Sequence, residues 1–172
     1  MSLGDEERKE NIVTYYLRAK KRYIGLNKGL DKQFYAEGLK DVWHSFDAFL
    51  GLNFPKQDNK LMQIEYCRIY QPIFEKWKKS DEFVDSVKRL RVFGKLQDMK
   101  PVRPKHPIEI ENIDNLLEII EFSFRVKSNL NHGSKDLESE NEAGKINRFL
   151  VERCFKVTFE ILERTLIKDK IL

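Results

Sequence analysis

The clearest structural pattern in the sequence is Phe34-Tyr-Ala-Glu-Gly-Leu-Lys-Asp-Val-Trp-His-Ser-Phe-Asp-Ala-Phe-Leu50. Its apolar side chains recur at alternating steps of four and three residues, which places them on one face of a helix. Asp31 can cap the N-terminus of this helix, and Gly51 follows its last apolar residue. The pattern therefore predicts a helix over residues 31–50, with a broad aromatic face that must be buried against other helices.

The same helical period recurs on both sides of this stretch. It predicts further helices over residues 5–23, 59–79, 80–94, 112–131 and 141–168. Pro72 is expected to kink or break the helix over 59–79, and the three prolines within 95–107 predict an extended loop. No strand alternation persists anywhere. The fold class predicted is all-α: an antiparallel helical bundle of five to six helices, in a single domain over residues 5–172.

Composition agrees with this fold class and narrows the function classes. The 172 residues are 41% hydrophobic and 12% aromatic, enough to build a core. The net charge of +4 is too small to predict nucleic-acid binding by itself. No apolar run is long enough to cross a membrane and the N-terminus is charged, so we expect no membrane association, no signal peptide and a cytoplasmic location. Cys67 and Cys154 lie far apart without a ligand-type motif, so we expect buried thiols, no metal and no cofactor.

One stretch carries chemistry-bearing side chains, Phe122-Ser-Phe-Arg-Val-Lys-Ser-Asn-Leu-Asn-His-Gly-Ser-Lys135. Arg125 and His132 are seven residues apart, so on a helix they differ by only about 20° around the axis. They would lie on one face, two turns apart, whereas Lys127 would lie elsewhere on the cylinder. A structural explanation is also open: Arg125 could pair with a glutamate one or two turns earlier, and His132 could cap the last carbonyls.

The run Arg125-Val-Lys-Ser-Asn-Leu-Asn-His132-Gly resembles the signature of the HEPN domain family. These small helical bundles carry an Arg, four to six residues and then a His, late in the chain and before the final helix. Residues 34–50 also resemble the aromatic second helix of the family, where an Asn often stands in place of Asp47. The resemblance covers residues 10–168 in helix order, and only these two segments match in residue detail.

The resemblance implies a function. Many HEPN proteins are metal-independent RNases, often toxins of toxin–antitoxin or other prokaryotic defence systems, whose motifs meet across a homodimer. It implies that His132 is the general acid/base and Arg125 clamps the transition state, with substrate contacts from Lys127, Asn129 and Asn131. The partners implied are RNA, a second copy of the chain and an antitoxin protein. The site would need no metal, because RNA carries its own nucleophile, the 2′-hydroxyl.

Departures from the family pattern leave two alternatives open. With a four-residue spacing the Arg position falls on Lys127, which lacks the planar guanidinium fork. With a six-residue spacing Arg125 is kept, but Val126 follows where a polar residue is usual. The chain could therefore be a catalytically inactive HEPN-like module that dimerises or binds RNA, nucleotides or a protein partner. It could also be a plain helical scaffold.

Two basic stretches and several aromatic residues each have two interpretations. Residues 85–106 hold seven basic against two acidic side chains, and residues 18–28 hold a second basic cluster. Either could follow a phosphate backbone or form a solvated helix face. Tyr15, Tyr16, Tyr23, Trp43 and Trp77 could stack on bases, but their helical spacing favours the core. His44 and Asp47 could form a proton relay or a local surface pair.

Overall fold

The computed structural model of the chain describes residues 3–26, 33–55, 58–77, 110, 112–131, 137 and 140–172. These residues form five helices: α1 (Leu3–Leu26), α2 (Gln33–Asn53), α3 (Asn59–Trp77), α5 (Leu116–Asn131) and α6 (Glu142–Lys168). The described residues contain no strand. The predicted all-α helical bundle is confirmed. The predicted helix over 80–94 and the loop over 95–107 lie outside the described residues.

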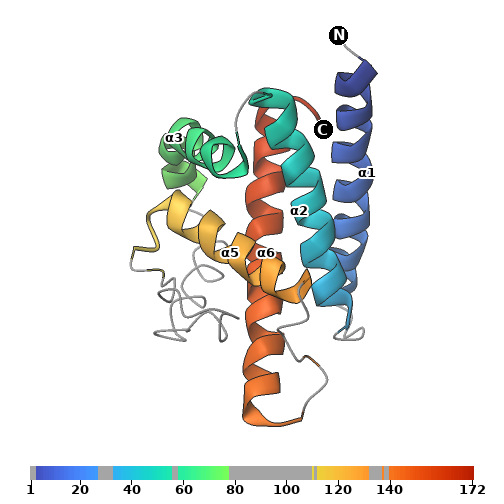
Figure 1. Ribbon diagram of the computed structural model, residues 1–172, viewed down its shortest axis with the longest axis vertical. Helices are drawn as coiled ribbons and strands as arrows, with labels where there is room; N and C mark the ends of the chain where they lie inside the picture. The colour runs from blue at the N-terminus through green and yellow to red at the C-terminus, as the bar shows by residue number, and fades with distance from the viewer. Residues whose placement is uncertain are drawn as a thin grey trace.

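The helices are arranged around α6, which runs through the middle of the molecule (Figure 1). α1 and α2 form an antiparallel hairpin on one side of α6, and α1 runs opposite to α6 as well (Figure 1). α3 and α5 lie on the other side, with α5 crossing α6 obliquely (Figure 1). The side chains of all five helices meet in one core cluster. None of the described helices is long and apolar enough to cross a membrane.

Aromatic residues of α2 fill the centre of this core, as the period of residues 34–50 predicts. Trp43 and Phe46 are fully buried and pack edge to face, with ring centroids 5.3 Å apart. The indole Nε1 of Trp43 donates to Ser123 Oγ at 3.1 Å, and Ser123 Oγ lies 2.5 Å from Thr158 Oγ1. These contacts form a buried chain that links α2, α5 and α6. They also give each of the three buried polar groups a partner, which such a group needs once water is excluded.

Polar contacts fasten α1 to α6 and to α2. Tyr16 donates to Glu163 Oε1 at 2.6 Å, and the Lys20 ammonium lies 3.1 Å from the same oxygen. Arg22 forms an ion pair with Asp41 of α2. Part of the basic cluster in residues 18–28 therefore serves contacts within the fold. Tyr16 and Trp43 are buried, which confirms their interpretation as core residues.

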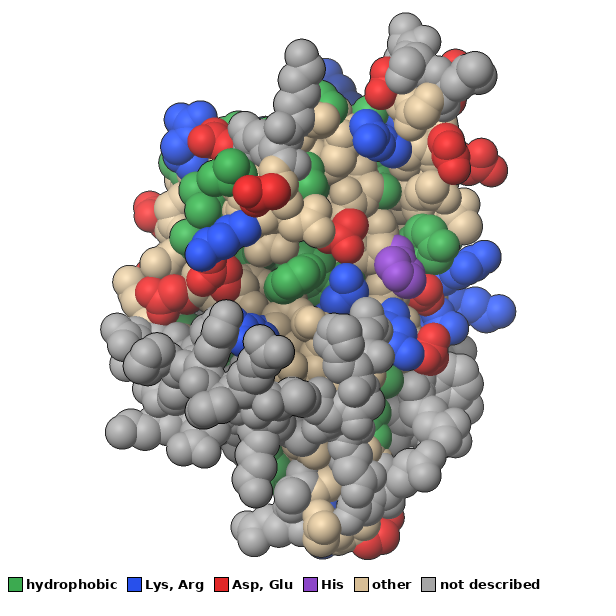
Figure 2. Space-filling view, in the orientation of Figure 1, with side chains coloured by type: hydrophobic (Ala, Val, Ile, Leu, Met, Phe, Trp, Pro, Cys, Tyr) green, Lys and Arg blue, Asp and Glu red, His purple; other side chains and the backbone are tan. Residues whose placement is uncertain are grey.

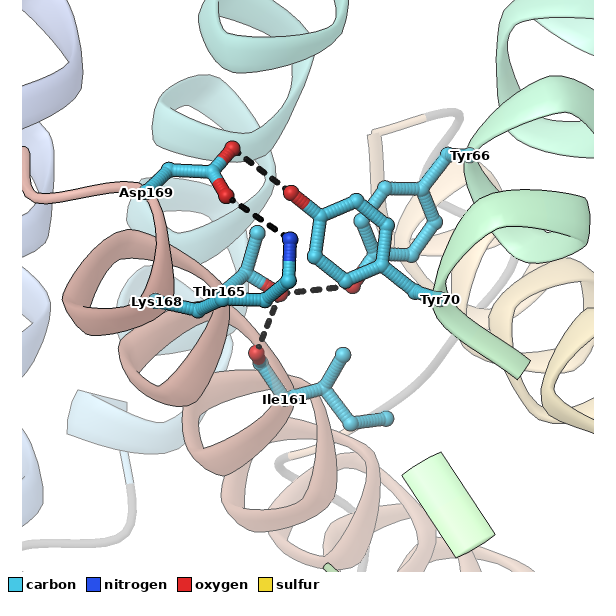
Figure 3. Close-up of polar contacts among 6 residues, drawn as sticks. All are labelled: Tyr66, Tyr70, Ile161, Thr165, Lys168 and Asp169. Carbon is cyan, nitrogen blue, oxygen red and sulfur yellow. Dashed lines mark hydrogen bonds and ion pairs between the residues drawn. The ribbon is translucent and has the colours of Figure 1, made fainter. Parts of the chain in front are cut away.

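A second set of contacts attaches α3 to the end of α6 (Figure 3). Thr165 Oγ1 donates to the carbonyl of Ile161 at 2.8 Å, so the Tyr66 hydroxyl, 2.7 Å from Thr165 Oγ1, must be the donor in that pair. Tyr70 donates to Asp169 Oδ2 at 2.6 Å (Figure 3). These bonds fix the position of α3, whose first turn contributes to the candidate site described below.

α3 continues through Pro72 as far as Trp77, so this proline does not break the helix. A proline inside a helix removes one N–H donor and leaves the carbonyl four residues earlier without its helical bond. Here both Pro72 and Arg68, the residue with that carbonyl, are on the exposed side of α3. Water can therefore satisfy the freed carbonyl, which lowers the cost of keeping the helix intact.

The two cysteines are buried, as expected. Cys67 is 4% exposed and Cys154 is fully buried, and neither forms a disulfide. Burial raises the pKa of the Cys67 thiol well above its usual value, because the thiolate would lose its hydration. The Cys67 thiol is therefore a core group and an unreactive one.

Candidate functional site

A groove between α3 and α5 contains the predicted site residue Arg125. Its volume is about 470 Å³ and it opens to solvent. The described residues that line it come from the first turns of α3 and the second half of α5: Asn59, Lys60, Gln63, Glu121, Phe124, Arg125, Ser128 and Asn129. Figure 2 shows the side of the molecule to which α3 and α5 belong, where basic, acidic and apolar side chains are interspersed.

Hydrogen bonds join the second half of α3 to the start of α5, and the groove lies between the other parts of the two helices. Gln71 Nε2 donates to the carbonyl of Asp114 at 2.7 Å, and Gln71 Oε1 accepts from the backbone N–H of Leu116 at 2.9 Å. These two hydrogen bonds join the Gln71 side chain to the start of α5, and they hold the two helices antiparallel. Gln63, eight residues before Gln71 on α3, and Phe124, eight residues after Leu116 on α5, both line the groove. Eight residues span about 12 Å of a helix.

Three polar residues of α5 share the groove. Arg125, Ser128 and Asn129 are spaced i, i+3 and i+4, so they project from one side of the helix. Glu121 lies one turn before Arg125 on the same side. With Lys60 from α3, the described charges around the groove are two basic and one acidic, a balance that favours an anionic ligand.

Lys127 lies on another side of α5 and does not line the groove. Its Nζ is 3.4 Å from Asp47 Oδ2, 5.2 Å from the centroid of the Phe124 ring and 5.9 Å from that of Trp43. The Lys127 side chain is only 12% exposed. The structure therefore brings Arg125 and Asn129 together but separates Lys127 from them.

His132 lies outside the described residues, and so does the side chain of Asn131, the last residue of α5. The roles predicted for His132, as general acid/base, and for Asn131, as a substrate contact, stay predictions. The basic stretch over 85–106 also lies outside the described residues.

The His44 and Asp47 side chains of α2 lie near Lys127. The His44 ring packs against the ring of Tyr15 from α1, with centroids 4.9 Å apart. Burial lowers the pKa of His44, and the Lys127 charge lowers it further. Burial raises the pKa of the Asp47 carboxyl, while the ammonium of Lys127 acts in the opposite direction.

The sequence interpretation missed the part of the groove that α3 contributes. Gln63 is 4% exposed and precedes Tyr66, Cys67, Tyr70 and Phe74 on the buried side of α3. A polar amide at the start of an otherwise mainly apolar buried stripe is a signal that sequence reading could have used. The opposite side chains of α5 lie some sixty residues later in the chain, so the pairing itself required the structure.

The described residues contain no group of three or more His, Cys, Asp or Glu side chains close enough to hold a metal ion. Comparison with known proteins adds no relative, since no family model, no curated protein and no solved structure gives a significant match. The features of this chain that bear on function are therefore the chemistry of the groove and the resemblance of the Arg125–His132 run.

Proposed function

We propose that this chain is an RNA-directed protein of the HEPN type and a metal-independent endoribonuclease. In support, Arg125, Ser128 and Asn129 line one open groove opposite Lys60. A guanidinium can hold two non-bridging phosphate oxygens, and amide and hydroxyl groups can donate to others. The biological setting that fits this activity is a cytoplasmic toxin or defence nuclease that acts as a homodimer and is restrained by an antitoxin protein.

The proposed reaction uses the nucleophile within RNA. His132, acting as a base, takes the proton of a 2′-hydroxyl, and the 2′-oxygen bonds to the adjacent phosphorus. The bond from phosphorus to the 5′-oxygen breaks, and that oxygen receives a proton from a general acid, a role that a second His132 across a homodimer could fill. Arg125 stabilises the extra negative charge of the five-coordinate phosphorus. The products would be a 2′,3′-cyclic phosphate and a free 5′-hydroxyl.

The decisive experiment incubates purified protein with mixed RNA in EDTA and compares the wild type with His132→Ala and Arg125→Ala. Each substitution should reduce cleavage at least about 100-fold, the usual contribution of a general acid/base or of a transition-state charge contact. Arg68→Ala is the matched control, because Arg68 is an exposed arginine of α3 that pairs with Glu65 and does not line the groove. An oligonucleotide with 2′-deoxyribose at every position should resist cleavage.

Equal cleavage by the wild type and His132→Ala, or no cleavage by either, would exclude the nuclease. Salt-dependent RNA binding without cleavage would then favour the inactive HEPN-like binding module. The salt bridge of Lys127 with Asp47 is consistent with that alternative, since it occupies the cation that the four-residue spacing of the motif would use.

A further inference from the structure

Gln63 is a buried amide with no internal hydrogen bond among the described residues. It is 4% exposed and lines the α3–α5 groove. Neither its carbonyl oxygen nor its amide nitrogen bonds to another described side chain or backbone group, and neither atom is sealed from solvent. Gln71, two turns later on α3, uses both ends of its amide to hold α5. Unlike Gln71, the Gln63 side chain makes no hydrogen bond that joins α3 to α5.

The Gln63 amide is open to the groove, so water pairs with it when the groove is empty and a ligand can take the place of that water. A glutamine at the first position of a buried stripe also gives up the apolar contact that leucine or methionine would supply. Asp58 Oδ1 already accepts from the backbone N–H of Leu61, so the first turn of α3 is capped from within the chain. Among the described residues that line the groove, Gln63 alone is buried, and its carboxamide has no partner within the described part of the chain.

The neighbours of Gln63 in the groove suit the other parts of a nucleotide. Lys60, one turn earlier on α3, is exposed and forms no ion pair within the described part of the chain. Arg125 supplies a second cation from α5, and Phe124 adds an apolar side chain to the lining. The cations suit a phosphate, and the apolar ring suits the face of a base. The donor and acceptor of the amide suit the edge of a base.

The geometry points to a base-reading subsite in which the Gln63 carboxamide hydrogen-bonds to the edge of one unpaired RNA base, while Lys60 and Arg125 hold the adjacent phosphates. This inference rests on the proposed function and extends it, because it makes the protein base-selective at one nucleotide. A carboxamide offers one donor and one acceptor side by side, so it pairs with any base edge that offers the complementary pair.

The chemistry of the amide predicts how the selectivity can be changed. Gln63→Met keeps the length of the side chain and removes both hydrogen-bonding groups, so the base preference should fall about tenfold or more towards none. Gln63→Glu keeps the shape but presents two acceptors. Guanine offers two adjacent donors on its Watson–Crick edge, so the Gln63→Glu protein should shift its preference towards guanine.

The test measures binding, so that it does not depend on cleavage. Fluorescence anisotropy would follow five-nucleotide RNAs that are 2′-O-methylated and differ only in the central base, with the wild type, Gln63→Met, Gln63→Glu and the control Arg68→Ala. The wild type and Arg68→Ala should prefer one base about tenfold or more over the least favoured base. Thermal unfolding of each variant would confirm that it is folded at the assay temperature.

The outcomes separate this inference from the nuclease proposal. Binding without any base preference, or the wild-type preference in either Gln63 variant, would overturn the subsite and leave the cleavage result unaffected. A Gln63-dependent preference in a protein that cleaves no RNA would support the subsite and exclude the nuclease. Absence of binding by the wild type to any of these RNAs would overturn the subsite, and the cleavage assay would decide the nuclease separately.

Discussion

The ammonium of Lys127 lies 3.4 Å from Asp47 on α2, whereas Arg125, two residues earlier on α5, lines the groove shared with α3. Two residues correspond to about 200° around a helix, so the two cations of the motif face nearly opposite ways. One of them stabilises the packing of α5 on α2. The other lines the groove.

Substitution of these two cations should therefore separate binding from stability. Arg125→Ala should weaken RNA binding, because Arg125 lines the groove. Lys127→Met should leave RNA affinity near that of the wild type but lower the free energy of unfolding by about 1 kcal/mol, because Asp47 loses its partner. Anisotropy with a short RNA and urea denaturation would measure the two effects. A large loss of affinity in Lys127→Met would contradict the placement of the site in the groove.

The Asp47 carboxyl should make stability depend on pH in an unusual direction. Burial raises its pKa in the folded state above the unfolded value, so the folded protein binds the proton more tightly than the unfolded chain does. The stability contributed by this group is present below the unfolded pKa, near 4, and is lost as the pH rises through the folded pKa.

Asp47→Asn removes this dependence and keeps the shape of the side chain. The wild type should gain stability relative to Asp47→Asn as the pH is lowered from 7 towards 4. Urea denaturation of both proteins at several pH values gives the difference directly. Titrating groups that do not interact with Asp47 cancel in it, whereas His44, whose pKa the Asp47 charge raises, contributes to it. A difference that moves in the opposite direction would show that the Lys127 charge dominates over burial.

The buried hydroxyl of Ser123 should be more important to stability than its size suggests. It accepts from the Trp43 indole and lies 2.5 Å from the Thr158 hydroxyl. Ser123→Ala leaves both partners buried without this bond, so the free energy of unfolding should fall by about 1–3 kcal/mol. Ser128→Ala on the same helix removes a hydroxyl that faces the open groove and should change it by less than about 0.5 kcal/mol. Equal effects of the two substitutions would contradict the buried chain.

Sequence periodicity predicted the parts of the fold that are set locally. The aromatic face of α2 is buried as expected, and α6 spans Glu142–Lys168 where a helix over 141–168 is predicted. The helical phase also predicted that Lys127 would lie away from Arg125. The identity of its partner, Asp47, depends on how helices eighty residues apart in the sequence pack together, and a single sequence does not encode that pairing in any local pattern.

The two glycines of α2 should respond to alanine in opposite ways. A Cβ at Gly38 would lie 2.7 Å from Cζ of Phe155, a fully buried ring of α6 that has little room to move. A Cβ at Gly51 would meet only the flexible side chain of Arg8, at 3.6 Å. Gly38→Ala should therefore lower the free energy of unfolding by about 1–3 kcal/mol through overpacking. Gly51→Ala should raise it by up to about 1 kcal/mol, because alanine is the better helix former.

Urea or thermal denaturation of the two variants beside the wild type provides the measurement, and each glycine serves as the control for the other. Both substitutions add one methyl group to the same helix, so their difference reports the approach of α2 to α6 at Gly38 and cancels intrinsic helix propensity. Stabilisation by Gly38→Ala as large as that by Gly51→Ala would mean that α2 and α6 are further apart at this point than the structure shows.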